Sequence, residues 1–483
     1  MLNIHRLIYR SPDIAWYTIT THLLSVIRLS SAPQAVRLQA ARVLDEILLV
    51  VPRNLTNAGE LQAQVQRRAL DVLAQQVVTE TVVSASGSST SIELRRMGLE
   101  TLHQILQSSG HTLVVGWETI FHMLESVCRP VVAPMRSAST DSASVFSVPP
   151  SPTRLKPPPL GLPNDKGYTS LVKIAFLSLT LVCDSISSLS PEHLRLCIST
   201  LGQFGRQADT NIALTAAASL LWSVSDAIQA NRKNAEQEPL YSDLWMFLLL
   251  EELGLCTDAR PEVRDGAIQT LFRAVQLYGS TLSTETWDHI IWKVTFPLLE
   301  ALTTETRQRT ATGMGGDASG HSAWDESKVL ALQSIGALFH EFLVSNVMRL
   351  ESFSNAWKTF VSHICDSVLL DNRLCSAPAL RCLEKAIRAS GATEGELKQC
   401  VEGVLERVWE AIDSLGDSIP RSADKPTPET LPQPPFTQES LVAFVDVIQC
   451  TRAVSHSIEG EEWQLDRLTR LMAILKGAFS PAW

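Results

Sequence analysis

The sequence predicts an all-α protein in which helix pairs stack side by side, and three observations support this prediction. Aromatic residues make up only 6% of the chain, so aliphatic residues carry the apolar content, a balance that suits packed helices better than sheets. Apolar residues recur at helical spacing along most of the chain. We find no run of alternating apolar and polar residues, the pattern of a half-buried strand.

Composition and charge limit the classes of protein to which the chain can belong. The 483 residues, 45% of them hydrophobic, can build several domains or one long stack of helices with a sizeable core. The formal net charge of −10 argues against general nucleic-acid binding, which needs a basic stripe. It also argues against electrostatic docking of the whole surface on anionic membranes. No leader sequence or membrane-spanning run is predicted, and the scattered cysteines are expected to be reduced thiols.

The segment over residues 258–299 is the most informative part of the chain. Asp258 and Pro261 mark a turn and a helix start. Apolar residues then recur at every fourth position on one helical face: Val263, Ala267, Leu271 and Val275. The pattern is typical of the second helix of a HEAT-type repeat. We therefore predict an armadillo/HEAT-like α-solenoid, a fold that binds other proteins along extended surfaces.

The chain divides into helical blocks and breaks. Helical repeats are predicted over 1–130, 169–302 and 323–415, with C-terminal helices over 438–483. The breaks are a disordered Ser/Pro-rich linker over 131–168, a flexible loop over 303–322 and a Pro-rich loop over 416–437.

Within the blocks, three apolar positions spaced by 29 residues indicate a loose repeat: Val36, Val65 and Leu94. Pro297 is expected to kink or end the helix that contains it. In the first break, Ser151 precedes Pro152 with Arg154 shortly after. It is a candidate phosphorylation site; the alternative is an unmodified linker.

Motifs that carry chemistry are missing from the sequence. There is no GxxxxGK[ST] phosphate loop, no GxSxG nucleophile elbow and no HExxH zinc helix. His363, Cys365, Cys375 and Cys382 have no CxxC spacing, and Cys382 fits a helix core. We predict no catalytic residues, no metal, no cofactor and no small-molecule substrate. The chain is therefore expected not to be an enzyme.

The final helix, over 465–476, has two interpretations. Its apolar side chains oppose its basic ones, and Phe479 and Trp483 follow. It can be a terminal solenoid helix that packs on its neighbour. Alternatively, it lies on a membrane or inserts in a partner's groove.

Several segments together resemble the Mon-two family of Golgi and endosome trafficking proteins, relatives of the large BIG and GBF Arf exchange factors. The resemblance rests on GWETIFHMLE at 116–125, RPEVRDGAIQTLFRAVQLYGSTLS at 260–283, residues 287–299 and SAWDESKVLALQSIGALF at 322–339. Family-motif residues in these segments are Trp117, Pro261, Arg264, Trp287, Trp292 and Trp324. We expect structural roles for them: the tryptophans as core anchors, and Arg264 as a tie between neighbouring repeats.

The resemblance implies a scaffold that is cytoplasmic and peripheral on Golgi and endosome membranes. It implies a role in endosome-to-Golgi and vacuolar transport, with a Dopey-type scaffold and a phospholipid flippase as partners. Family members are much longer, so the chain resembles a middle-to-C-terminal portion, and dimerisation or GTPase binding is not implied. Nothing resembles the Sec-seven catalytic module. Two alternatives stay open: a regulatory portion of an Arf-type guanine nucleotide exchange factor, or a HEAT-repeat nuclear transport or phosphatase scaffold.

Overall fold

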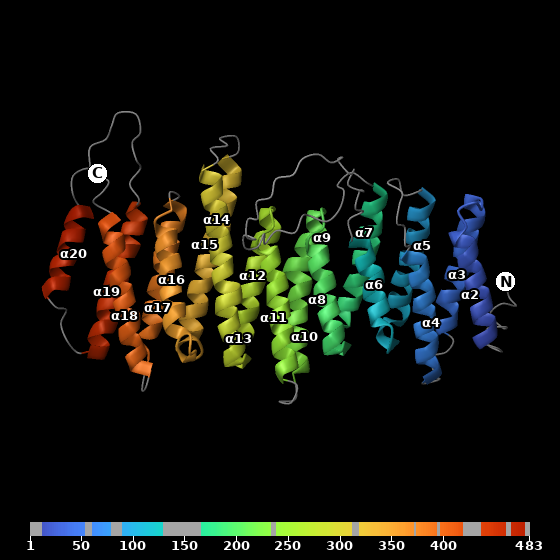
Figure 1. Cartoon of the computed structure of the whole chain (residues 1–483), viewed down its shortest axis with the longest axis horizontal. Coiled ribbons are helices and arrows are strands. Elements are labelled where there is room, and N and C mark those ends of the chain that lie inside the picture. Colours follow the sequence, from blue (N-terminus) through green and yellow to red (C-terminus); the bar gives the residue numbers. More distant parts are fainter. Residues whose placement is uncertain are drawn as a thin grey trace, which may run out of the picture. The chain divides into compact units, whose positions relative to one another are not determined.

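The structure is a computed structural model. It describes the following residues: 12–53, 60–78, 89–128, 166–232, 238–311, 318–370, 373–393, 397–418, 436–459 and 465–478. In this part of the chain every regular element is a helix (Figure 1). The chain forms two compact units, unit 1 over Met1–Gln237 and unit 2 over Glu238–Trp483. The candidate phosphorylation site, Ser151, lies outside the described residues.

Unit 1 consists of helices packed side by side in two rows. Its elements are α2 (Pro12–Arg28), α3 (Gln34–Arg53), α4 (Glu60–Val77), α5 (Ser89–Ser109), α6 (Trp117–Cys128), α7 (Lys166–Asp184), α8 (Pro191–Gly205) and a continuous run of α9 (Thr210–Thr215), η3 (Ala216–Leu220) and α10 (Leu221–Asn231). Helices α3, α5 and α7 contact one another in one row, and α2, α4, α6 and α8 form the other. This alternation is the arrangement of a helical-repeat solenoid.

Unit 2 repeats the arrangement. Its elements are α11 (Glu238–Leu255), α12 (Pro261–Tyr278), the run of α13 (Thr284–His289), η6 (Ile290–Thr295) and α14 (Phe296–Ala311), then α15 (Ala318–Phe342), α16 (Phe353–Val368), α17 (Ser376–Ser390), α18 (Lys398–Ser418), α19 (Gln438–Glu459) and α20 (Leu465–Ala478). One row holds α12, α15, α17 and α19; the other holds α14, α16, α18 and α20. The predicted fold class, an armadillo/HEAT-like α-solenoid, is confirmed.

Local sequence explains where several helices begin. Ser190 caps α8 by accepting a hydrogen bond from the backbone N–H of His193, and Pro191 fills the first helical position. Asp209 caps α9, and its side chain accepts from the N–H groups of Asn211 and Ile212. These residues satisfy N–H groups that have no partner within the helix.

The predicted flexible loop over 303–322 differs from the structure at both ends. Helix α14 continues to Ala311, and α15 already begins at Ala318. Thr303 and Thr306 belong to α14 because their buried hydroxyls donate to backbone carbonyls one turn earlier, at 2.6 Å and 2.9 Å. Local hydrogen bonding of this kind makes threonine tolerable within a helix, so the break predicted around GMGGDASG at 313–320 was placed too early at its start.

Pro297 does not end its helix; an end was one of the two expected outcomes, and a kink was the other. The chain is helical from α13 through α14, and the six residues before Phe296 form a π-helical turn, η6. The N–H of Phe296 donates to the carbonyl of Ile291, five residues back. A wide turn just before a proline accommodates a ring that would otherwise clash with the preceding turn.

The 29-residue spacing is not a structural repeat. Val65 and Leu94 are buried, but Val36 is 49% exposed in the first turn of α3. The three positions also lie on α3, α4 and α5, which belong to different rows. The repeating unit is a pair of helices, so a spacing that advances by one helix at a time mixes the two rows.

Two helical segments of unit 1 are long and apolar enough to cross a membrane by length and composition: Gly167–Asp184 and Thr210–Asn231. Part of each apolar stretch is buried inside the unit: 39% of the stretch in the first segment and 56% in the second. Buried core helices reach the same hydropathy as spanning helices, so this finding by itself indicates no membrane span.

Candidate functional site

Arg264 is the centre of a buried polar cluster in unit 2. The side chain lies on α12 and is fully buried. Its Nε donates to Ser327 Oγ at 2.7 Å, and one terminal nitrogen donates to the carbonyl of Ala323 at 2.9 Å. The other terminal nitrogen donates to the carbonyls of Asp258 and Ala259, at 2.9 Å and 3.4 Å. One guanidinium thus joins the α11–α12 turn to α15.

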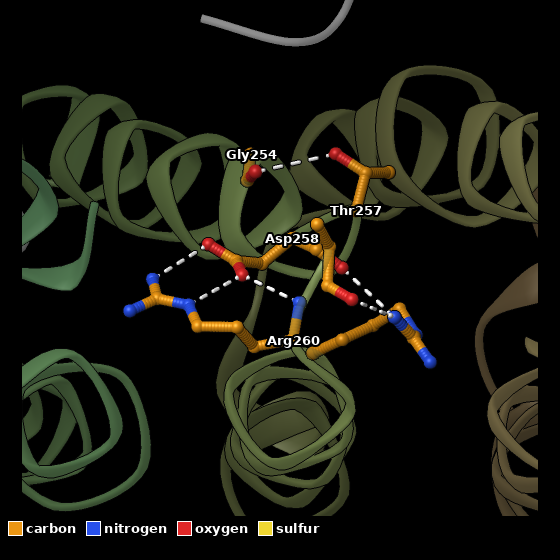
Figure 2. A network of polar contacts seen from close by, with 6 residues as sticks. Gly254, Thr257, Asp258 and Arg260 are labelled. Atoms are coloured by element: carbon orange, nitrogen blue, oxygen red, sulfur yellow. Dashed lines mark hydrogen bonds and ion pairs between the residues drawn. The ribbon is translucent and has the colours of Figure 1, made fainter. Parts of the chain in front are cut away.

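Asp258 holds the turn that supplies two of these carbonyls. One carboxylate oxygen accepts from the backbone N–H and the Nε of Arg260, both at 2.9 Å, and the other accepts from a terminal nitrogen of Arg260 at 2.9 Å (Figure 2). Thr257 closes the end of α11 by donating to the carbonyl of Gly254 at 3.3 Å. The turn therefore has a fixed shape before Pro261 starts α12.

The remaining contacts of the cluster come from α12 and α15. The guanidinium carbon of Arg264 lies 3.8 Å from the centre of the Trp324 ring, a close cation–π contact. Ser327 donates to Asp265 and lies 2.9 Å from the carbonyl of Ala323. A buried charge is tolerated when it is fully hydrogen-bonded, and this cluster satisfies that condition.

Trp287 and Trp292 belong to the same helical run but have different surroundings. Trp287 is fully buried, and its indole N–H donates to the carbonyl of Gly279 at 2.9 Å. Its ring lies 5.1 Å from that of Phe342. Trp292 is half-buried, and its indole N–H donates to Ser352 Oγ at 3.0 Å. Trp287 anchors α13 to α12, whereas Trp292 joins η6 to the start of α16.

Trp117 lies in unit 1, apart from the other family-motif residues in the sequence. It begins α6 and is buried, 4% exposed. Gly116, the residue before it, has φ +89°, a left-handed conformation that favours glycine. A Cβ at Gly116 would lie 2.4 Å from Leu70 Cδ1. Trp117 therefore follows a tight turn that brings α6 against α4.

Two further arginines play the same part as Arg264. Arg37 on α3 donates to the carbonyl of Ile27 at the end of α2, 2.8 Å away. Arg95 on α5 donates to the carbonyl of Val77 at the end of α4 at 3.0 Å, and to that of Ser126 on α6 at 3.3 Å. Carbonyls in the last turn of a helix have no partner within the helix. These arginines satisfy them and join one helix row to the other.

Three buried ionisable groups have shifted pKa values. Burial raises the pKa of Asp45 to about 7, although hydrogen bonds from Thr101 and Gln76 work in the opposite direction. Burial also raises the pKa of Glu252, which is fully buried and finds no hydrogen-bond partner among the described residues. Burial lowers the pKa of Lys328 to about 8; its Nζ donates to Thr303 Oγ1 at 2.8 Å. Burial, rather than a catalytic partner, is the first cause in each case.

The arrangement holds helices together and shows no reactive centre. Among the described residues, no group of three or more His, Cys, Asp or Glu side chains could hold a metal ion. The four residues weighed above as a metal set, from His363 to Cys382, form no such group. Each polar side chain of the Arg264 cluster makes at least one hydrogen bond within the fold.

The structure brings some of the sequence-predicted residues together and leaves others apart. Arg264 and Trp324 are in direct contact, and Pro261 begins the helix that carries Arg264. Trp117, Trp287 and Trp292 lie elsewhere. Sequence reasoning missed Ser327 and Asp265, because a serine and an aspartate 62 residues apart give no local signal. It also missed Arg95, although an arginine in an apolar helical stripe was a usable clue.

These observations define a class of protein. Paired helices stack in two rows, arginines bond to backbone carbonyls of neighbouring helices and turns, and the outward faces remain for binding, so the protein is an α-solenoid of the armadillo/HEAT type. A family model for the C-terminal region of Mon2 protein matches residues 231–412. This range covers α11 to α18 of unit 2. Over these residues the chain is similar to the Mon2 (Mon-two) family.

Curated relatives extend the similarity beyond the matched range. The chain is 27% identical over 373 residues to the Protein MON2 homolog of Drosophila melanogaster, covering 70% of this chain and 20% of the relative. It is 27% identical over 429 residues to the human Protein MON2 homolog, covering 80% and 22%. The chain thus spans about a fifth of the length of these relatives.

A more distant similarity connects the chain to an exchange-factor family. It is 29% identical over 133 residues to Brefeldin A-inhibited guanine nucleotide-exchange protein 2 of Arabidopsis thaliana. That match covers 26% of this chain and 7% of the relative.

Proposed function

We propose that the chain is a non-catalytic helical-repeat scaffold in endosome-to-Golgi and vacuolar protein transport. The observation that carries the proposal is the similarity to the Mon2 family of unit 2, the unit that contains the Arg264 cluster. Because the polar groups of that cluster are used inside the fold, binding has to occur on the outward faces of the helices. Proteins of this class act through such extended faces.

Within unit 2, helices α17 and α18 expose side chains of opposite charge. Helix α17 exposes basic side chains: Arg381, Lys385 and Arg388. Helix α18, in the other row, exposes acidic ones: Glu402, Glu406, Glu410, Asp413 and Asp417. Surfaces of opposite charge favour different partners and set the orientation of docking. A scaffold that joins two partners needs two such faces.

We propose a Dopey-type scaffold and a phospholipid flippase as the protein partners. The chain would then lie in the cytoplasm, peripheral on Golgi and endosome membranes, with membrane contact made directly or through these partners. The similarity to the Mon2 family supports this assignment. The acidic net charge favours recruitment by proteins over electrostatic attachment to anionic lipid.

Affinity capture from a lysate of the chain's own organism, read by mass spectrometry, tests the proposal. The tagged chain should recover a Dopey-like scaffold and a flippase. Recovery of importin cargo or phosphatase subunits instead would favour the HEAT-repeat transport or phosphatase alternative and overturn the proposal.

Charge reversal shows which row binds. Lys385→Glu alters the α17 row, and Glu402→Lys with Glu406→Lys alters the α18 row. We expect one set to reduce recovery of a partner at least fivefold while the other leaves it unchanged. Unfolding temperatures equal to that of the wild type serve as the control for folding.

A second candidate function is a regulatory portion of an Arf-type guanine nucleotide exchange factor. The similarity to the Arabidopsis exchange protein favours it. The test adds the purified chain to an isolated Sec-seven module and an Arf-type GTPase and measures nucleotide release. A concentration-dependent change in the exchange rate supports this candidate. An exchange rate that stays unchanged at high concentrations of the chain would contradict this second candidate and favour the scaffold proposal.

A further inference from the structure

Helix α20 is attached to unit 2 by one face only. Arg470 forms ion pairs with Asp413 and Asp417 of α18. The guanidinium carbon of Arg467 lies 5.2 Å from the centre of the Trp409 ring, also on α18. Both arginines of α20 are therefore turned toward α18.

The opposite face of α20 is apolar and exposed. The exposed fractions are 77% for Leu465, 40% for Leu468 and 67% for Met472. Thr469 and Ala473, which lie among them, are exposed and uncharged. With 3.6 residues per turn these positions share one side of the helix. In the described part of unit 2, α20 is the last helix of its row (Figure 1), and no described helix covers this side.

The two ends of this face carry opposite charges. Asp466 lies in the first turn of α20 and Lys476 in the last turn, and both are exposed. If two copies of α20 pack antiparallel about a two-fold axis near residue 470, Thr469 of each copy lies opposite Met472 of the other. Asp466 of each copy then lies within reach of Lys476 of the other. A parallel pairing would place like charges side by side.

We propose that this face binds a second copy of the chain, with α20 packed antiparallel against α20 in a two-fold symmetric interface. Self-complementary patches of this kind are the usual basis of symmetric dimers. The apolar side chains form the centre, and two Asp466–Lys476 ion pairs form the ends. One helix of 14 residues from each copy offers less contact than a standard interface of roughly 800 Å² per partner, so we expect a weak dimer with a Kd on the order of micromolar or above.

Analytical ultracentrifugation of the full chain tests the proposal, over roughly 1 to 200 µM to bracket the expected Kd. The wild type should pass from monomer to dimer in this range. Met472→Glu should raise the Kd at least tenfold, because it buries a charge at the centre of the interface. Val442→Glu on α19 is the matched control, since Val442 is also an exposed apolar residue, 55% exposed, and it should leave the Kd unchanged.

Charge reversal tests the antiparallel register. Asp466→Lys and Lys476→Glu should each weaken the dimer about fivefold, because each places like charges at both ends. The double variant restores opposite charges and should recover most of the affinity. A double variant weaker than either single variant would overturn the register.

Other occupants of the face give different results. A chain that stays monomeric at all concentrations overturns the proposal. So does a chain that dimerises only after truncation at Ala478, which would mean that residues 479–483 occupy the face. Binding to phosphatidylcholine–phosphatidylserine vesicles that is lost in Met472→Glu, without self-association in solution, would assign the face to a membrane instead.

Discussion

Arg264 shows how much of this fold depends on single side chains. Three of its four hydrogen-bond acceptors are backbone carbonyls, and the fourth is Ser327 Oγ. A planar guanidinium can reach acceptors in several directions at once, whereas an ammonium group on a flexible chain cannot. The residue therefore joins three segments that no single hydrophobic contact would fix.

Arg264→Lys should destabilise unit 2 by about 3 kcal/mol, because it keeps the buried charge but leaves carbonyls without donors. Denaturant unfolding followed by circular dichroism measures the change. Arg273→Lys is the control: it lies on the same helix but is exposed, and its effect should stay within about 0.5 kcal/mol. Equal effects of the two substitutions would contradict the role given to Arg264.

Asp45 predicts a pH dependence of stability in unit 1. Its pKa is about 7 in the folded state against an ordinary value of 3.8, so folding favours the protonated form. The stabilisation is complete below about pH 4 and is lost as the pH rises through 7, by roughly 4 kcal/mol in total. Asp45→Asn should remove this dependence. The check is the difference between wild-type and variant unfolding free energies from pH 5 to 9, which should grow up to about pH 7 and then level off.

At the scale of helices, close approach is set by large side chains meeting small ones. Trp287 packs against Gly279, where an added Cβ would lie 2.9 Å from the indole. Ile474 of α20 packs against Gly416 of α18, where an added Cβ would lie 2.4 Å from Ile474 Cδ1. Helix pairs of this kind tolerate little change in volume.

Trp287→Ala should mainly lower the melting temperature, with a loss of about 3 to 5 kcal/mol from the cavity that it creates. Trp292→Ala, at a half-buried site of the same helical run, should lower the free energy of unfolding by about half as much. Calorimetry of both variants gives the comparison. Unchanged stability of Trp287→Ala with lost partner binding would contradict a core role.

Gly416→Ala should loosen α20 from α18, because the added methyl group occupies the position of Ile474. Hydrogen exchange of the α20 amides should then be faster. Gly403→Ala on the same helix is the control, since nothing lies within 4 Å of its added Cβ. It should stabilise α18 by up to about 1 kcal/mol. Unchanged exchange in α20 would mean that Ile474 shifts without loss of contact.

At the scale of the whole molecule, the chain forms two compact units. The hydrogen bonds of Arg264 and Trp287 all have their partners inside unit 2. A fragment of residues 238–483 should therefore unfold cooperatively by itself. Trp287→Ala should lower its melting temperature by the same amount as in the full chain. A fragment without cooperative unfolding would show that unit 2 depends on unit 1.

The sequence predicted the fold class because helical periodicity and small residues at contact positions are local signals. It identified Arg264 and Trp324 as family-motif residues. It could not predict the contact between Asp265 and Ser327, because that contact depends on the packing of α12 against α15. Of the two outcomes expected at Pro297, a kink or an end, the end was wrong, because the preceding wide turn lets the helix continue and has no sequence signature. Buried charges such as Lys328 were also missed, because burial is a tertiary property.

The wide turn at η6 has a consequence for how the helical run can vary. A π-helical turn contains one residue more than an α-helical path through the same contacts. Deletion of one residue between Ile290 and Thr295 would convert this turn to regular α-helix while α14 keeps its position and phase, so Leu298, Leu299 and Leu302 should stay buried. Deletion of one residue within the regular part of α14 would instead rotate everything that follows it by about 100°. The helical run should therefore tolerate the loss of one residue at η6 better than at any regular position.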